Sequence, residues 1–447
     1  MPLEIWYIVA LIAVIGITFL LMKRPIYECM FYGYALMVLL TNQWENFFGY
    51  ITKTSTDTLF YSIIAFLVLG KILDATHAID TVTNVLVALL GRLPGGAAYT
   101  AVIASTFMGA LSGSGAGNVA TTGVFTIPAM KKTGIPAHLA ANIESSASTM
   151  GNMIPPSGVI VAALACYNEF SGAELSQSTF WIVVWGIALY FILQRITTVF
   201  FFCKYYKVKP MSKEDLPDLK ETVKEGWPNL LLPVIILLPF VLDYLFKTTF
   251  FAQRLGAGAS NLSSSLLLFT PGMAAVYALM VNRKRMRGEN LVDKIAKSVS
   301  GIVPVGATIF FAYCISNLFA ATDIGTQIGA FFVSLELPRV VLALLIPLVC
   351  AILGMVFPGS AQTKIFGTTL ITVYTAAGGN PLLCAAMLPA VTGAMEGMTP
   401  PLALCMYTAM GIAGSKFKET TLNCLIWVLI HYVLSAVILM GLLPVAL

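Results

Sequence analysis

The sequence predicts an all-α polytopic membrane protein built from two inverted repeats, each with a re-entrant helical hairpin and a broken helix. Hydrophobic residues make up 58% of the 447 residues and charged residues only 11%, whereas soluble chains carry about 25% charged residues. Apolar runs long enough to span a bilayer recur along the chain. A further observation, a pattern of interrupted helices that occurs twice, predicts the repeats.

The repeated pattern lies in residues 108–158 and again in residues 354–402. In both stretches glycine, serine and threonine crowd between apolar residues, and a pair of prolines, which lack the helical N–H, interrupts a helix. The copies stay in register: Gly113-Ser114 matches Gly359-Ser360, and Met153-x-Pro155-Pro156 matches Met398-x-Pro400-Pro401. Broken backbone at membrane depth persists only where it is buried in protein or lines a polar cavity. The repeat therefore predicts a transport site.

Other classes of function fit the composition poorly. The net charge is +5, and lysines and arginines occur in short clusters between apolar runs, which is typical of topology signals and not of a nucleic-acid surface. Eight cysteines and three histidines are scattered singly, so we expect neither disulfides nor a transition-metal site. The sequence has no phosphate-binding loop and no nucleophile elbow. We expect no enzyme activity and no organic cofactor.

The N-terminal run 5–22 predicts a retained first span. Glu4 precedes it and Lys23-Arg24 follow it, which is the wrong order for a cleaved signal peptide and places the N-terminus outside by the positive-inside rule. Further helices are expected at residues 26–42, 58–74 and 79–90.

Residues 97–111 and 119–130 predict the first hairpin. Each is too short to cross a bilayer comfortably, and both outer ends carry charge of the cytoplasmic type, at Arg92 and at Lys131-Lys132. Two short helices with their ends on one side form a re-entrant hairpin, which here opens to the cytoplasm. Helix 136–150 then enters the bilayer, breaks at 151–158 and resumes to about 166.

The second hairpin is expected from the outside, because helix 301–320 crosses outward before it. Its helices are predicted at 340–356 and 364–375, and a second broken helix at 381–394 is interrupted at 395–401 and resumes to 413. Spans at 179–201, 229–246 and 264–281 lie between the repeats, and helix 421–445 ends outside. The expected domains are scaffold helices 1–78, first transport repeat 79–168, scaffold helices 169–320 with cytoplasmic linker 204–228, second transport repeat 321–413 and C-terminal helix 414–447.

The tips and breaks offer ligands for a sodium ion. Hydroxyl and carbonyl oxygens are hard ligands, and broken helices expose backbone groups that bind ions. The expected sodium ligands are Ser112, Gly113, Ser114, Asn118, Ser148, Thr149 and Gly151 in the first repeat, and Gly359, Ser360, Thr363, Thr392, Gly393, Glu396 and Thr399 in the second. The alternative is that the small residues serve only close helix packing, but four clusters in two matched pairs favour a site.

Charged residues within the spans are costly and usually face a cavity or a partner. Lys364, which corresponds to Asn118 in the first repeat, is either the counter-ion of an anionic substrate or the partner of Glu396 or Glu144. Glu144 is expected to be structural and hydrated near the start of its helix. The residues expected to bind the substrate are Ser114, Asn118, Asn152, Ser360 and Lys364.

These motifs resemble a known family. The stretch SGSGAGNVATTGVFTIPAMKKTG followed by ESSASTMGNMIPP is similar to the large membrane subunit of tripartite ATP-independent periplasmic (TRAP) transporters. The earlier LLGRLPGGAA and the later GSAQTKI and GMTPP match in order, so the resemblance covers nearly the whole chain. The NVATTG form looks closer to the TAXI-type branch than to the dicarboxylate branch.

The resemblance implies an elevator mechanism in which hairpins and broken helices form a mobile transport domain. It also implies Na⁺ as the coupling ion, a periplasmic substrate-binding protein that delivers a small organic anion, and a bacterial inner-membrane location. The small four-helix membrane subunit of the family would be a separate chain, and both termini would be periplasmic. A stand-alone divalent-anion symporter and a channel-like or scaffolding membrane protein remain the alternatives.

Overall fold

The computed structural model describes residues 3–112, 115–212, 214, 216–256, 258–286, 293, 296, 302–355, 357–400 and 402–445. Over these residues the chain forms helices and no strands. Seven helical segments among them are long and apolar enough to cross a membrane. The predicted all-α, polytopic class is therefore confirmed.

The N-terminal helices pack against a helix from the middle of the chain. They are α1 (Leu3–Gly16), which continues as the π-helical turn η1 (Ile17–Leu21), α2 (Ile26–Leu40), the 3₁₀ turn η2 (Trp44–Asn46) and α3 (Phe47–Ser55). The partner is α16 (Val303–Ala321), which lies against α2 and α3. Buried Leu11, Tyr34 and Leu318 belong to the shared apolar core.

The first repeat contains a hairpin and a broken helix, as the sequence predicts. Its elements are α5 (Ala78–Leu90), α6 (Gly96–Ser112), α7 (Gly115–Lys132), α8 (Ala137–Met150), η3 (Gly151–Met153) and α9 (Gly158–Ser171). The helix stops before Pro155 and Pro156 because neither has an N–H to donate. Ser157 then caps α9, since its hydroxyl accepts a hydrogen bond from the N–H of Val159 (3.3 Å).

The second repeat has the same order of elements, with the short helix α21 in the place of the 3₁₀ turn η3. Its elements are α17 (Ile324–Ser334), α18 (Arg339–Leu353), α19 (Gly359–Ala376), α20 (Pro381–Val391), α21 (Gly393–Glu396) and α22 (Leu404–Ala413). The sequence prediction missed α17. It also placed the start of α19 five residues late, because Pro358 already supplies an extended N-cap (φ −61°, ψ 146°). It placed the start of the second helix break at Met395, whereas α20 already ends at Val391.

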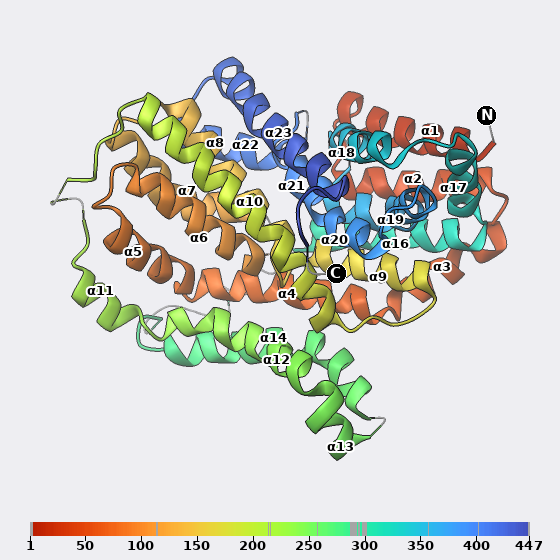
Figure 1. Cartoon of the computed structure of the whole chain (residues 1–447), viewed down its shortest axis with the longest axis horizontal. Coiled ribbons are helices and arrows are strands. Elements are labelled where there is room, and N and C mark those ends of the chain that lie inside the picture. The colour runs from red at the N-terminus through yellow and green to blue at the C-terminus, as the bar shows by residue number, and fades with distance from the viewer. Residues whose placement is uncertain are drawn as a thin grey trace.

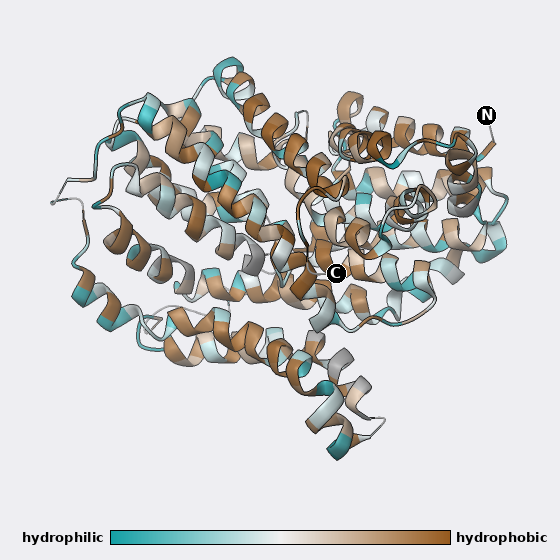
Figure 2. Cartoon of the chain, in the orientation of Figure 1, coloured by the Kyte–Doolittle hydropathy of each residue, from teal (hydrophilic) through white to brown (hydrophobic). Residues whose placement is uncertain are grey.

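The remaining helices are α4 (Thr58–Ala75), α10 (Gln177–Tyr205), α11 (Leu219–Gly226), the 3₁₀ turn η4 (Asn229–Leu231), α12 (Leu232–Phe246), the π-helical turn η5 (Lys247–Phe251), α13 (Ala252–Leu255), α14 (Gly258–Val281) and α23 (Phe417–Leu439). The predicted cytoplasmic linker therefore contains a helix, α11, which Asp218 caps through the N–H of Glu221 (2.8 Å). Figure 2 shows that hydrophobic residues dominate the long helices, while hydrophilic residues gather on α11 and in the loops.

The two repeats exchange the second halves of their broken helices. Helix α9 of the first repeat packs against α19 and α20, and α22 of the second repeat packs against α7 and α8. In Figure 1 the first hairpin lies on the left and the second on the right, and the breaks meet between them. Helices of both repeats therefore pack around the two breaks.

Candidate functional site

The two breaks touch each other at the centre. The Nδ2 of Asn152, in the first break, donates to the carbonyl of Gly393 in the second (2.5 Å). A Cβ added to Gly397 would clash with Thr149, and one added to Gly359 would clash with backbone atoms of Gly393. Glycine is required at these positions because helix ends and broken backbone approach more closely than a side chain allows.

Several predicted sodium ligands of the second repeat come together beside this contact. The hydroxyls of Thr363 and Thr392 are 2.7 Å apart, and both residues are buried. The carboxylate of Glu396 accepts a hydrogen bond from the N–H of Gly359, at the start of α19. The Thr399 hydroxyl instead donates to the carbonyl of Met395 in its own turn (3.1 Å). The tip and the break thus present hydroxyl, carboxylate and backbone oxygens to one region.

In the first repeat Asn118 joins the hairpin to the broken helix. Its Nδ2 donates to the carbonyl of Ser105 (2.7 Å) and to the hydroxyl of Ser148 (2.9 Å). Its Oδ1 is buried and has no hydrogen-bond partner among the described residues, so it is available as a ligand. Gly113 and Ser114 lie outside the described residues, as does the side chain of Ser112.

Glu144 is not hydrated, and that expectation is wrong. The side chain is fully buried, and its carboxylate accepts hydrogen bonds from Ser105 (2.6 Å), Thr122 (2.6 Å), Thr126 (2.5 Å) and Ser148 (3.3 Å). Within the described part of the chain no basic side chain pairs with it. The missed signal was spacing, because Thr122 and Thr126 lie four residues apart on one helical face.

Lys364 pairs with neither of the carboxylates considered from the sequence. Its Nζ lies 3.7 Å from Glu169 of α9 and 4.9 Å from the ring centroid of Tyr313 of α16. The predicted pairing of Lys364 with Glu396 or Glu144 is therefore wrong. The reason is that α9, the second half of the first broken helix, packs against α19 and places Glu169 beside Lys364. The counter-ion function of Lys364 stays a prediction.

A cavity of about 300 Å³ lies between the two hairpins and the helices α2, α4 and α16. Asn152 and Ser360 line it, whereas Asn118 and Lys364 do not. Its polar side chains are those of Asn152, Ser157, Thr308, Ser360, Glu396 and Cys405. Apolar residues of α4 and α16, among them Phe66 and Ile309, form the opposite wall. Among the described residues, the lining includes one carboxylate and no basic side chain.

Residues 5–445 match the family model of the DctM component of tripartite ATP-independent periplasmic transporters. The chain belongs to this family. It is 24% identical to the C4-dicarboxylate TRAP transporter large permease protein of Pseudomonas aeruginosa, over 86% of this chain and 85% of that protein. It is 22% identical to the sialic acid TRAP transporter large permease protein of Vibrio cholerae, over 88% and 87%.

The isethionate TRAP permease of Oleidesulfovibrio alaskensis is 23% identical over 84% of this chain, which spans 55% of that protein. Among solved structures, Neisseria gonorrhoeae MtrF has a TM-score of 0.61 at 15% identity and is covered over 83%, with 90% of this chain aligned. The Alcanivorax borkumensis YdaH transporter has a TM-score of 0.57 at 17% identity, with 90% and 89% covered. These two structural similarities show the fold of this chain alone.

The protein is thus a TRAP transporter large membrane subunit, a multi-pass bacterial membrane protein whose relatives are permeases and not enzymes. That the chain belongs to this family confirms the resemblance that the tip and break motifs indicate. The TAXI-type branch stays a prediction.

Proposed function

We propose that this subunit imports a small organic anion bearing a carboxylate, coupled to Na⁺ and by an elevator mechanism. The central cavity carries the proposal, because both hairpin tips, both breaks and the helices α4 and α16 line the same space. Relatives named for C4-dicarboxylate and sialic acid transport support a carboxylate substrate.

The charge of the cavity supports coupling to a cation. In the part of the chain that the structure describes, its lining includes Glu396 and no lysine, arginine or histidine. An anion that enters it therefore meets a carboxylate without a balancing positive charge from these residues. Charge in a low-dielectric site is unfavourable unless it is compensated. Sodium ions bound at the tips and breaks would supply that compensation. Substrate binding would then depend on Na⁺ for an electrostatic reason.

The proposed sodium sites are the two clusters of oxygen ligands. In the second repeat Thr363, Thr392 and Glu396 supply side-chain oxygens beside broken backbone. In the first repeat Asn118 offers the unpartnered Oδ1 next to Ser148. Helix termini and carbonyls freed by the breaks complete such sites in transporters with discontinuous helices.

The wall opposite the tips supports movement of the repeats as a unit. Ile63, Phe66 and Leu67 of α4 and Ile309 of α16 are apolar, so sliding past them breaks few directional hydrogen bonds. The repeats would be the mobile transport domain and the remaining helices the scaffold. The proposed partners are a periplasmic binding protein and a separate small membrane subunit, with the chain in the inner membrane and both termini periplasmic.

Uptake into proteoliposomes tests the proposal. The subunit is reconstituted with its small membrane subunit, and uptake of a radiolabelled C4-dicarboxylate or sialic acid is measured with and without an inward Na⁺ gradient and the binding protein. We expect uptake that requires both. Uptake without the binding protein would identify a stand-alone symporter, and uptake indifferent to Na⁺ would exclude sodium coupling.

A further inference from the structure

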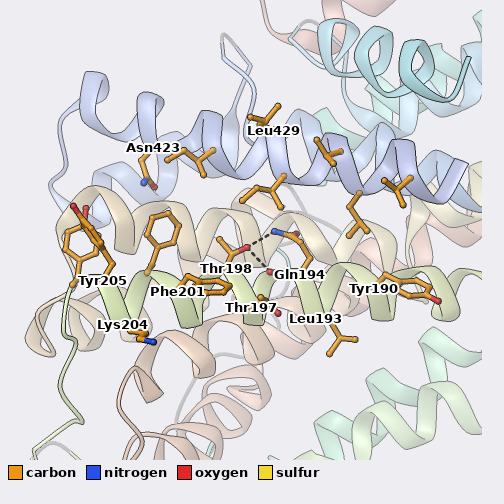
Figure 3. Close-up of a pocket in the computed structure, with 17 residues that line it drawn as sticks. Tyr190, Leu193, Gln194, Thr197, Thr198, Phe201, Lys204, Tyr205, Asn423 and Leu429 are labelled. Atoms are coloured by element: carbon orange, nitrogen blue, oxygen red, sulfur yellow. Dashed lines mark hydrogen bonds between the residues drawn. The ribbon is translucent and has the colours of Figure 1, made fainter. Parts of the chain in front are cut away.

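A long apolar groove runs between α10 and α23 (Figure 3). Its volume is about 1330 Å³, larger than the roughly 300–1,000 Å³ of small-molecule pockets. It shares no lining residue with the central cavity. The groove is therefore separate from the central cavity.

The walls of the groove suit hydrocarbon chains better than a protein helix. Leu193, Phe201, Leu429 and Val433 are each more than half exposed, so a flexible apolar occupant would bury large side chains. Glycine, alanine, serine and threonine are the residues that let a second helix approach closely in a membrane. Among the described lining residues, Thr197 and Thr198 alone belong to this group, and most of the others are large leucine, isoleucine, valine, phenylalanine and tyrosine side chains. A flexible chain can fill the spaces between the large side chains.

One end of the groove is basic and aromatic. Lys204 and Tyr205 lie at the same end as Asn423, and Tyr190 lies at the other end (Figure 3). Lys204 opens the run that continues with lysines at 207 and 209, which the positive-inside rule assigns to the cytoplasmic surface. Tyrosine is also enriched at the membrane–water interface. The groove thus begins at the depth of lipid headgroups.

Gln194 and Thr198, in the middle of the groove, already form hydrogen bonds within the protein. The Nε2 of Gln194 donates to the hydroxyl of Thr198 (2.9 Å), and its Oε1 accepts a hydrogen bond from buried Arg195. The amide of Gln194 therefore needs no ligand, and an acyl chain can lie across it.

We propose that this groove binds one phospholipid of the cytoplasmic leaflet with an anionic headgroup. The phosphate lies beside Lys204, and the acyl chains follow Phe201 and Leu429 toward Tyr190. The helix rises about 22 Å over the fifteen steps from Tyr190 to Tyr205, whereas one leaflet of the roughly 30 Å hydrocarbon core is about 15 Å deep. The groove is therefore long enough for a whole chain. The lysines favour an anionic over a zwitterionic lipid.

Native mass spectrometry of the purified chain with added phosphatidylglycerol or phosphatidylcholine tests the proposal. We expect one phosphatidylglycerol per chain, retained at lower concentration than phosphatidylcholine. Leu429→Trp narrows the groove and lowers retention of both lipids, while Leu425→Trp, at a similarly exposed position on the same helix but not among the residues that line the groove, retains them. Lys204→Gln weakens phosphatidylglycerol binding about fivefold and leaves phosphatidylcholine unchanged, whereas Lys220→Gln on α11 changes neither.

Three results would overturn the proposal. Equal retention of the two lipids by the unmodified chain would contradict the preference for an anionic headgroup. Identical lipid retention by the Leu429→Trp and Leu425→Trp variants would contradict binding in the groove. A third overturning result would be loss of a second copy of the chain on Leu429→Trp without loss of lipid, which would identify a protein interface instead. Thermal unfolding of each variant in detergent separates these outcomes from misfolding. The measurement requires no transport, so its result is independent of the proposed function.

Discussion

Thr363→Val tests the sodium site of the second repeat with the least disturbance of its packing. The Thr392 hydroxyl donates to the carbonyl of Leu388 (2.7 Å), so the Thr363 hydroxyl is the donor in the 2.7 Å pair and keeps its lone pairs for a cation. Valine has nearly the same shape and leaves no buried donor unpaired. The cost to folding is therefore that of one neutral hydrogen bond, about 1 kcal/mol.

The cost to sodium binding should be larger. An interaction of a hydroxyl with a charged group contributes about 1.5–3 kcal/mol, which corresponds to a roughly 10- to 100-fold loss of Na⁺ affinity. The half-saturating Na⁺ concentration for uptake into proteoliposomes should rise accordingly. Thr372→Val is the matched control, because its hydroxyl donates to the carbonyl of Thr368 (2.9 Å) on the same helix. A folded Thr363→Val protein with the unmodified Na⁺ dependence would refute the assignment.

Three other substitutions test the site. Gly359→Ala should reduce uptake at least tenfold, because its methyl group meets backbone atoms of Gly393 that cannot rotate away, at a cost of about 1–3 kcal/mol of strain. Gly186→Ala is the control and should retain uptake, because its methyl group meets nothing within 4 Å. Equal uptake by the two variants would contradict the close contact. Glu144→Gln should destabilise the fold by about 1–3 kcal/mol, because an amide N–H₂ replaces an acceptor of hydroxyl donors. Thermal unfolding in detergent measures this against exposed Glu419→Gln, and equal midpoints would exclude a structural network. Lys364→Gln distinguishes the two functions considered for Lys364. The ion pair with Glu169 outside the cavity predicts unchanged substrate affinity, whereas the counter-ion function predicts reduced binding of substrate.

The candidate site could be predicted in part from the residues. Composition and the paired prolines located both breaks, and Asn152, Ser360 and Glu396 do line the central cavity. The network around Glu144 escaped prediction because its donors come from three helices, α6, α7 and α8, whose facing sides are not apparent in a linear pattern. The partner of Lys364 escaped it for a related reason. Glu169 lies in the half-helix that crosses into the other repeat.

The sequence by itself determined the all-α membrane class, the hairpins and the breaks, because these depend on local properties: run length, helix-breaking residues and interspersed charge. Only the tertiary structure decided which oxygens meet, since the exchange of α9 and α22 between the repeats joins Asn152 to Gly393 across 241 positions. Contacts of that separation depend on packing of whole helices. The same holds for the groove between α10 and α23, whose walls are distant in the chain and come together only when the helices pack.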